Sequence, residues 1–370
     1  MRGDDRRSVW AEIDLGALRA NVHAFRSAVA PAVLCAVVKA DASGHGAVPA
    51  SRAVLEAGAR VLAVANVDEG EELRAAGIDA PIMVLSQPRP EDASAVAELG
   101  LEPVVYTAEG IDALAAAVGP HPVGVHLKVD TGMHRVGCPP DRATDLARRI
   151  ETAPGLVLAG VCTHFAVADH PGHDFTVAQQ TRFAAVLAGL ADVGIAPGTI
   201  HACNSAAAFT ASAAHSDMVR IGIGLYGVVP GLPEPGVELR PVMAVKARVA
   251  HAQQLGPGEG VSYGLRYTTE RSTRIVTVPI GYADGVPRGL GMRGGVVLVR
   301  GRRRPIAGTV TMDQLMVDVG DDPVEPGEEV VLVGERGGER IGVEEWARLM
   351  DTIPNEIVCG IGPRVPRRYP

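Results

Sequence analysis

Short apolar runs alternate with amphipathic stretches from about residue 30 to residue 225, and this alternation constrains the fold more than any other feature. Eight runs of strand length occur, at residues 33–38, 61–65, 82–85, 102–106, 123–129, 156–162, 199–203 and 217–221. Stretches with helical periodicity lie between them, among them residues 68–77, 138–150 and 175–194. Alternating strands and helices predict a parallel sheet, and eight such units predict a closed (β/α)8 TIM barrel. A doubly wound sheet is the alternative, but no G-x-G-x-x-G turn follows the first run.

The pattern changes after residue 232. Short runs typical of β-strands follow, joined by glycine and proline turns, with one clear helix at residues 343–350. The proline- and glycine-rich segment at 230–236 marks the boundary. We therefore expect an α/β barrel over residues 12–232 and a mostly-β domain over residues 233–370, with residues 1–11 packing on the β domain.

Composition and charge exclude several classes of partner and site. The net charge is −8 and no long basic run occurs, which disfavours nucleic acid and membrane surfaces as partners. No apolar run is long enough to span a membrane and no signal segment opens the chain, so we expect a cytoplasmic protein. The five cysteines form no C-x-x-C pair. A disulfide framework and a metal site are therefore not expected.

Polar residues collect at the predicted carboxyl ends of the strands, where barrel enzymes place their active sites. The excess of basic groups there predicts an anionic ligand, and a hydroxyl beside a glycine-rich turn predicts a phosphate site. A phosphate site beside an isolated lysine indicates pyridoxal 5'-phosphate held as a Schiff base. A barrel enzyme that acts on sugar phosphates through a lysine fits these residues almost as well. They are Lys39, Lys128, Arg135, His164, Asn204, Ser205, Arg220, Gly222 and Ile223.

Motifs spread over both predicted domains resemble bacterial alanine racemase, a pyridoxal-phosphate enzyme of fold-type III. They occur in the family's order and cover nearly the whole chain: AVVKADASGHG (36–46), HLKVDTGMHRVG (126–137), THFAVAD (163–169), NSAA (204–207), VRIGIGLYG (219–227), VSYG (261–264), GYADGVPR (281–288) and TMDQLMVDV (311–319). The resemblance implies an isomerase that interconverts L- and D-alanine. It also implies a homodimer with shared active sites and a role in making D-alanine, a peptidoglycan precursor.

The resemblance further implies a role for each matching residue. Lys39 carries the cofactor as an aldimine and is one catalytic base, and Tyr263 from the other subunit is the opposite base. Racemisation removes a proton from one face of Cα and returns it on the other, so two opposed bases suit it. Arg135 lies near the substrate carboxylate. Lys128 matches a lysine that is carbamylated in the family and orients that arginine. Met312 and Tyr282 from the other subunit line the substrate entrance.

Further residues match the family's cofactor site. His164 and Arg220 form a supporting network, with Arg220 at the pyridine nitrogen. The phosphate contacts match Asn204, Ser205, Gly222 and Ile223.

Two positions depart from the family pattern. Ser43 and Asn355 stand where the family commonly has tyrosines of the phosphate grip and pocket wall. Substrate identity therefore stays open between alanine and serine or another small polar amino acid. A lyase or decarboxylase on the same scaffold is a further alternative. So is a cofactor carrier without activity, although such carriers end at the barrel.

Overall fold

The computed structural model describes residues 8–211, 214–228 and 237–370. Its chain divides into two compact units. The first runs to Ala17 and resumes at Ser43–His45 and Pro241–Pro370, and the second holds Leu18–Ala42 and Gly46–Arg240. The expected boundary at 232/233 lies outside the described residues. Glu12, which we expected to open the barrel, lies in a strand of the first unit.

Eight parallel strands form the core of the second unit, in the order β8-β7-β6-β5-β4-β3-β2-β9. Two backbone hydrogen bonds join the first and last strands of this order to residues flanking each other's ends, from Asp217 to Ile200 (3.1 Å) and from Arg220 to Cys203 (3.0 Å). The predicted TIM barrel is confirmed, since each strand coincides with one predicted apolar run. The strands are β2 (Val33–Val37), β3 (Val61–Val64), β4 (Ile82–Val84), β5 (Leu101–Val105), β6 (Val123–Lys128), β7 (Leu156–Cys162), β8 (Thr199–His201) and β9 (Met218–Ile221).

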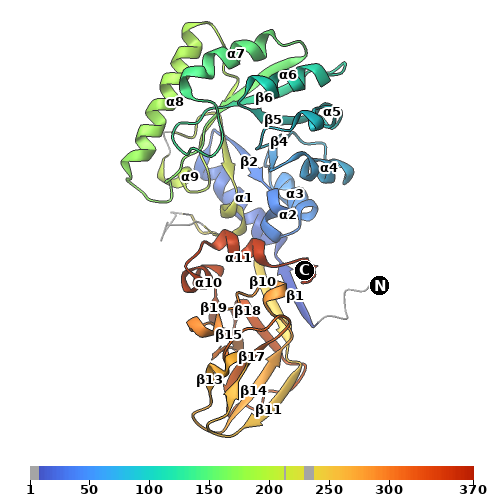
Figure 1. Cartoon of the computed structure of the whole chain (residues 1–370), viewed down its shortest axis with the longest axis vertical. Helices are drawn as coiled ribbons and strands as arrows, with labels where there is room; N and C mark the ends of the chain where they lie inside the picture. The colour runs from blue at the N-terminus through green and yellow to red at the C-terminus, as the bar shows by residue number, and fades with distance from the viewer. Residues whose placement is uncertain (1–7, 212–213, 229–236) are drawn as a thin grey trace. The chain divides into compact units, whose positions relative to one another are not determined.

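Helices cover the outside of these strands, as Figure 1 shows for α4 to α8. Side chains that accept from free backbone amides fix where helices begin: Asn66 caps α4 and Thr107 caps α6. The buried residues of α4 and α6 are glycine and aliphatic side chains, so these two helices pack closely on the strands. The helices are α1 (Leu15–Val29), α2 (Lys39–Gly44), α3 (Ala47–Glu56), α4 (Val67–Ala75), α5 (Ala93–Glu98), α6 (Ala108–Ala117), α7 (Ala143–Thr152), α8 (Asp174–Asp192) and α9 (Ala207–Thr210).

The first unit is mostly β, as expected. Its main sheet has the order β16-β15-β18-β10-β1-β20, with β19 paired to β18, and β11-β14-β17 and β12-β13 form smaller sheets. The strands are β1 (Val9–Ile13), β10 (Met243–Arg248), β11 (His251–Leu255), β12 (Gly260–Val261), β13 (Tyr267–Thr268), β14 (Thr273–Val278), β15 (Val296–Val299), β16 (Arg302–Pro305), β17 (Leu315–Gly320), β18 (Glu329–Arg336), β19 (Glu339–Ile341) and β20 (Arg367–Arg368).

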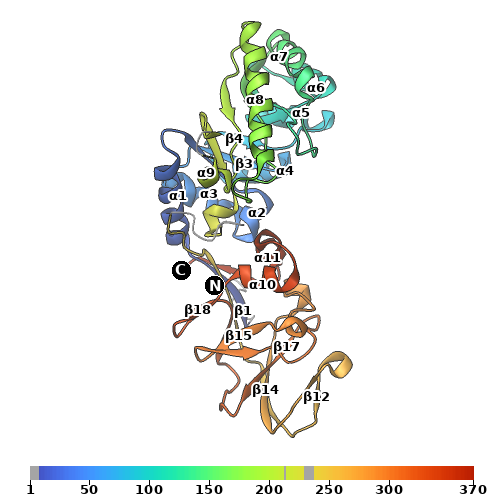
Figure 2. The same ribbon diagram turned by 90° about the vertical axis from the view of Figure 1, so that its left-hand side faces the viewer.

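Both ends of the chain enter this main sheet. β1 pairs antiparallel with β10, so that Val9 lies opposite Ala247, and pairs parallel with β20. Helix α10 (Val343–Met350) matches the predicted helix, and α11 (Pro354–Gly360) was not predicted. Figure 2 shows α10 and α11 side by side in this unit. In the part of the chain that the structure describes, no helix is both long and apolar enough to cross a membrane.

Candidate active site

Lys39 opens a turn of unusual handedness. It follows strand β2 and the buried Val38, and its side chain is exposed. The next four residues, Ala40 to Ser43, have φ between 52° and 54°, which is the left-handed region. An L-residue loses roughly 1–2 kcal/mol in that region, so the turn is strained. Strain of this kind persists only where surrounding contacts fix it, and here it sets the direction in which the chain leaves Lys39.

Hydrogen bonds to both ends of the turn hold it in place. The amide of Ala40 donates to Glu69 Oε1 at 2.8 Å. The carboxylate of Asp41 accepts from the amide of Ala47 at 2.6 Å, and the Asp41 carbonyl accepts from Gly46 at 3.0 Å. The small residues after Lys39, which we interpreted as room for a cofactor, therefore also form a braced left-handed turn.

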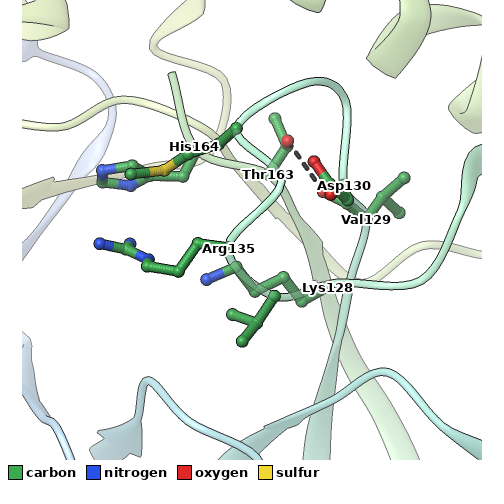
Figure 3. A pocket seen from close by; sticks show the side chains of 8 residues that line it. Lys128, Val129, Asp130, Arg135, Thr163 and His164 are labelled. Atoms are coloured by element: carbon green, nitrogen blue, oxygen red, sulfur yellow. Dashed lines mark hydrogen bonds between the residues drawn. The ribbon is translucent and has the colours of Figure 1, made fainter. Parts of the chain in front are cut away.

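Lys128, Arg135 and His164 line one pocket of the barrel unit. Figure 3 shows their nitrogen-bearing ends on the same side, with the carboxylate of Asp130 turned away from them. That carboxylate accepts from the amides of Gly132 (2.9 Å) and His134 (3.0 Å). The pocket therefore presents basic groups, while its own acid is used to shape the loop after β6.

Electrostatics show how closely the basic groups gather. Burial lowers the pKa of His164 well below its usual value, and the charges of Arg220, Lys128, Arg135 and Lys39 lower it further. Burial also lowers the pKa of Lys128, with Arg220, Arg135 and Lys39 acting in the same direction. The structure thus brings together all five basic residues that the sequence placed at the barrel mouth. An anionic ligand would relieve this repulsion.

Arg220 is buried at the end of β9 and firmly held. Its Nη2 donates to the carbonyls of Thr163 (2.8 Å) and Ala202 (3.0 Å) and lies 3.3 Å from His164 Nδ1. Its Nη1 lies 2.5 Å from His201 Nδ1. Arg220 and His164, which the resemblance assigns to one supporting network, therefore lie in contact.

The predicted phosphate residues lie after β8 and β9. Ser205 is buried, and its Oγ accepts from the amides of Gly222 (2.9 Å) and Gly224 (3.3 Å). Ile223 follows at the start of a short 3-10 helix. The side chain of Asn204 accepts from the amide of Ala207 at 2.9 Å, so its oxygen holds the helix start. The Ser205 hydroxyl thus joins the segment after β8 to the Gly222–Ile223 turn after β9, and Asn204 holds the start of α9 next to Ser205.

Tyr263 projects from the β unit, with 71% of its surface exposed. It follows Ser262, whose φ is 65°, and precedes Gly264, whose φ is 78°. Ser262 Oγ donates to the Thr309 carbonyl, and Thr309 Oγ1 donates to the Tyr263 carbonyl at 3.1 Å. A strained, cross-braced turn therefore presents this phenol outward.

The two predicted entrance residues, Tyr282 and Met312, lie on two segments that are hydrogen-bonded to each other. The amide of Tyr282 donates to Thr311 O, and the amide of Ala283 donates to Met312 O, both at 3.0 Å. A Cβ at Gly281 would lie 2.3 Å from Thr311 O, so only glycine permits this approach. Residues 309–312 therefore brace both the Tyr263 turn and the Tyr282 turn, and Met312 and Tyr282 are exposed together.

Ser43 and the helix that carries Asn355 belong to the same unit. A Cβ on Gly44, next to Ser43, would lie 2.6 Å from Val358 O in α11. Arg367 Nε donates to the Gly44 carbonyl at 2.9 Å. Asn355 lies in the first turn of α11 and is partly buried. The two departures from the family pattern therefore sit on segments that pack directly against each other.

Comparison with known proteins identifies the family to which this chain belongs. The model of the alanine racemase N-terminal domain matches residues 13–230, and that of the C-terminal domain matches residues 242–369. The chain belongs to the alanine racemase family. It is 48% identical to an alanine racemase of Symbiobacterium thermophilum over 99% of this chain and 98% of that protein. The crystal structure of an alanine racemase from E. faecalis superposes with a TM-score of 0.94 at 36% identity, covering all of both chains. That of Streptomyces coelicolor gives 0.92 at 43% identity, covering 98% of each chain.

Sequence reasoning missed the residue that supports the His164 loop. Gln179 in α8 is fully buried, its Oε1 accepts from Ala166 at 2.9 Å, and its Nε2 donates to the His164 carbonyl at 2.9 Å. Its position on the buried face of an amphipathic helix was the available signal, because a glutamine there must find partners. Arg367 gave no such signal, since its acceptors are backbone carbonyls, and one of them, Gly44 O, is far away in the sequence.

Proposed function

We propose that this member of the alanine racemase family interconverts L- and D-alanine with pyridoxal 5'-phosphate, using Lys39 and Tyr263 of the partner subunit as the two bases. The observation that carries the proposal is a cluster of basic groups: Lys128, Arg135 and His164 line one pocket, and the charges of Lys39 and Arg220 also act on His164. Full-length similarity to alanine racemases supports the substrate.

The residues at the barrel mouth suit a phosphorylated aldehyde cofactor. Lys39 supplies an exposed primary amine. The Ser205 hydroxyl and the adjoining Gly222–Ile223 backbone supply polar groups for a phosphate, and the basic cluster balances its charge. Phe25 packs against the backbone of this segment so closely that a Cβ at Gly224 would lie 2.5 Å from its ring. When bound, pyridoxal 5'-phosphate holds the amino acid through its amino group and withdraws electrons from Cα, which makes the Cα proton acidic.

Lys39 and Tyr263 then move the proton. We propose that the amine of Lys39 exchanges a proton with Cα on the D side and the phenol oxygen of Tyr263 on the L side. The exposed, braced position of Tyr263 supports its use by a second copy of the chain, since a phenol that serves its partner must project from its own surface. A homodimer with shared sites follows from this role.

Arg135, oriented by Lys128, would hold the substrate carboxylate. The guanidinium of Arg135 is suited to a carboxylate, and the pocket keeps it beside Lys128. Burial among cations favours the neutral amine of Lys128. That amine can add CO2, releasing one proton and forming a carbamate. The product is an anion that would orient Arg135 and reduce the local positive charge.

A racemase that prefers serine is the second candidate. Ser43 and Asn355 favour it, because both replace tyrosines of the family and lie on packed neighbouring segments. An amide at position 355 offers both a donor and an acceptor to a hydroxymethyl side chain. In either case we propose a cytoplasmic enzyme, and for alanine a source of the D enantiomer for peptidoglycan.

Isotope exchange tests the proposal directly. The holoenzyme is incubated in D2O with L- and D-alanine, L- and D-serine and other amino acids, and deuterium at Cα is followed with the enantiomeric ratio. We expect exchange and inversion from both alanine enantiomers. Borohydride treatment followed by peptide mapping should label Lys39. Label on Lys128 or Lys246, or decarboxylated or deaminated products, would overturn the assignment.

A further inference from the structure

Four polar side chains form a chain through the interior of the barrel, from β9 to β5. Arg220 Nη1 lies 2.5 Å from His201 Nδ1, His201 Nε2 lies 3.0 Å from His126 Nδ1, and His126 Nε2 lies 3.4 Å from Glu102 Oε2. Arg220, His201 and His126 are buried, whereas the Glu102 side chain is 35% exposed. This chain, which we call the histidine relay, therefore links the cationic site to a carboxylate that reaches water.

The relay is a built feature. Barrel interiors are usually filled with apolar side chains, and Cys35, Ala63, Met83 and Met218 pack in that way here. Beside the relay, strand β7 has a glycine. A Cβ at Gly160 would lie 2.3 Å from His126 Nδ1, so the strand leaves room for this ring. Buried polar groups persist when they satisfy one another, which makes the direction of each hydrogen bond the next question.

The two ends determine the direction of every proton in the relay. Arginine only donates, and an ionised carboxylate only accepts. His201 must therefore present a bare Nδ1 to Arg220 and carry its proton on Nε2. That proton points to Nδ1 of His126, which must be bare as well. His126 then carries its proton on Nε2 and donates it to Glu102.

Burial supports a neutral His201 ring in this arrangement. It lowers the pKa of His201 well below the usual value, and the charges of Arg220 and Lys128 act in the same direction. A neutral imidazole has one donor and one acceptor, which is what each ring needs here.

We propose that Glu102 and His126 are positioning residues of the racemase, which act through His201 to hold the guanidinium of Arg220 at the barrel mouth. The carbonyls of Thr163 and Ala202 hold Nη2 of Arg220. Its Nη1 depends on His201, which can accept from it only while His201 Nδ1 carries no proton. An acceptor at position 102 keeps the proton of His126 on Nε2. His126 Nδ1 then accepts the Nε2 proton of His201, and His201 Nδ1 stays without a proton. The functional part of this inference rests on the proposed racemase activity, and the proton positions do not.

Three variants of the full-length holoenzyme separate the relay from ordinary packing. Glu102→Leu removes the acceptor, and Glu102→Gln keeps an acceptor oxygen without the charge. Glu98→Leu, at an exposed position of α5, is the matched control. The first readout is the ring 15N spectrum of histidine-labelled protein from pH 6 to 9, with His126 and His201 assigned by substitution. The second is kcat and KM for racemisation.

In the wild-type protein we expect the proton of both rings on Nε2 throughout this pH range. In Glu102→Leu we expect part of the His201 population to gain a proton on Nδ1. There kcat should fall by about three- to tenfold with KM changed less than about twofold. Glu102→Gln and Glu98→Leu should behave as wild type in both readouts.

A wild-type His201 with a proton on Nδ1 would overturn the relay, whether or not the protein racemises alanine. Equal loss of kcat in Glu102→Gln and Glu102→Leu would assign the effect to charge and overturn the acceptor role. Unchanged kcat and unchanged His201 nitrogens in Glu102→Leu would overturn the positioning role.

Discussion

Among single residues, Lys128 illustrates how burying a cation in the basic site lowers the stability of the folded protein. Burial among like charges lowers its pKa, so between its folded-state pKa and the usual value near 10.5 the unfolded chain binds more protons than the folded one. Stability therefore rises with pH through that window and is lowest below it.

Substituting Lys128→Met should raise the stability of the cofactor-free protein at pH 7 by about 1–2 kcal/mol, because it removes a buried charge and keeps most of the volume. It should also flatten the dependence of stability on pH between neutrality and pH 10. Thermal unfolding midpoints in CO2-free buffers at a series of pH values check this. Lys246→Met is the control and should destabilise, since Lys246 pairs with Glu12. A Lys128→Met protein less stable than wild type at pH 7 would contradict the account.

Asn355 carries the second prediction at this scale. Asn355→Tyr, alone and with Ser43→Tyr, should strengthen cofactor binding by about tenfold, which is the effect of one hydrogen bond to a charged group. It should also lower the ratio of kcat/KM for serine to that for alanine, because a ring fills the space of the amide. Cofactor titration and paired kinetics measure both quantities. A wild-type enzyme without serine turnover, or an unchanged ratio, leaves alanine as the substrate.

At the scale of elements, the turn after Lys39 stores strain that a helix propensity scale does not anticipate. Four non-glycine residues in a left-handed conformation are unfavourable, and the acceptors supplied by Glu69 and Asp41 offset part of that cost. The sequence feature that permits the turn is the run of small side chains from Ala40 to Ser43.

Ala40→Gly should therefore stabilise the protein by about 1 kcal/mol, because glycine adopts the left-handed conformation without a steric penalty. Ala40 is exposed, so little packing is lost. The control is Ala116→Gly in α6, also exposed, where the same change should destabilise by about 1 kcal/mol. Equal destabilisation by both substitutions, read from chemical unfolding curves, would mean that the turn is not strained.

At the scale of the whole molecule, the proposed site draws on two copies of the chain. A Lys39→Ala variant and a Tyr263→Phe variant should each be nearly inactive. One of the two sites in a heterodimer then holds both bases, so the isolated heterodimer should reach about half of the wild-type specific activity. An unfractionated random mixture, in which about half of the dimers are heterodimers, should reach about a quarter. Co-expression with two different affinity tags isolates the heterodimer for assay. No recovery in the isolated heterodimer, or a wild type that sediments as an active monomer, would exclude a shared site.

Periodicity by itself determined the barrel, because strand and helix lengths depend on local alternation, and all eight strands occur at the predicted runs. The motifs likewise determined the family. Other features depend on contacts between residues far apart in sequence, and only the tertiary structure decided them. The left-handed turn requires Glu69, the direction of the histidine relay requires Arg220 and Glu102 at opposite ends, and the Ser43 segment meets α11 through Gly44 and Val358. Each of these features depends on which distant backbone carbonyl or side chain the fold places in contact, and a local sequence pattern does not predict such contacts.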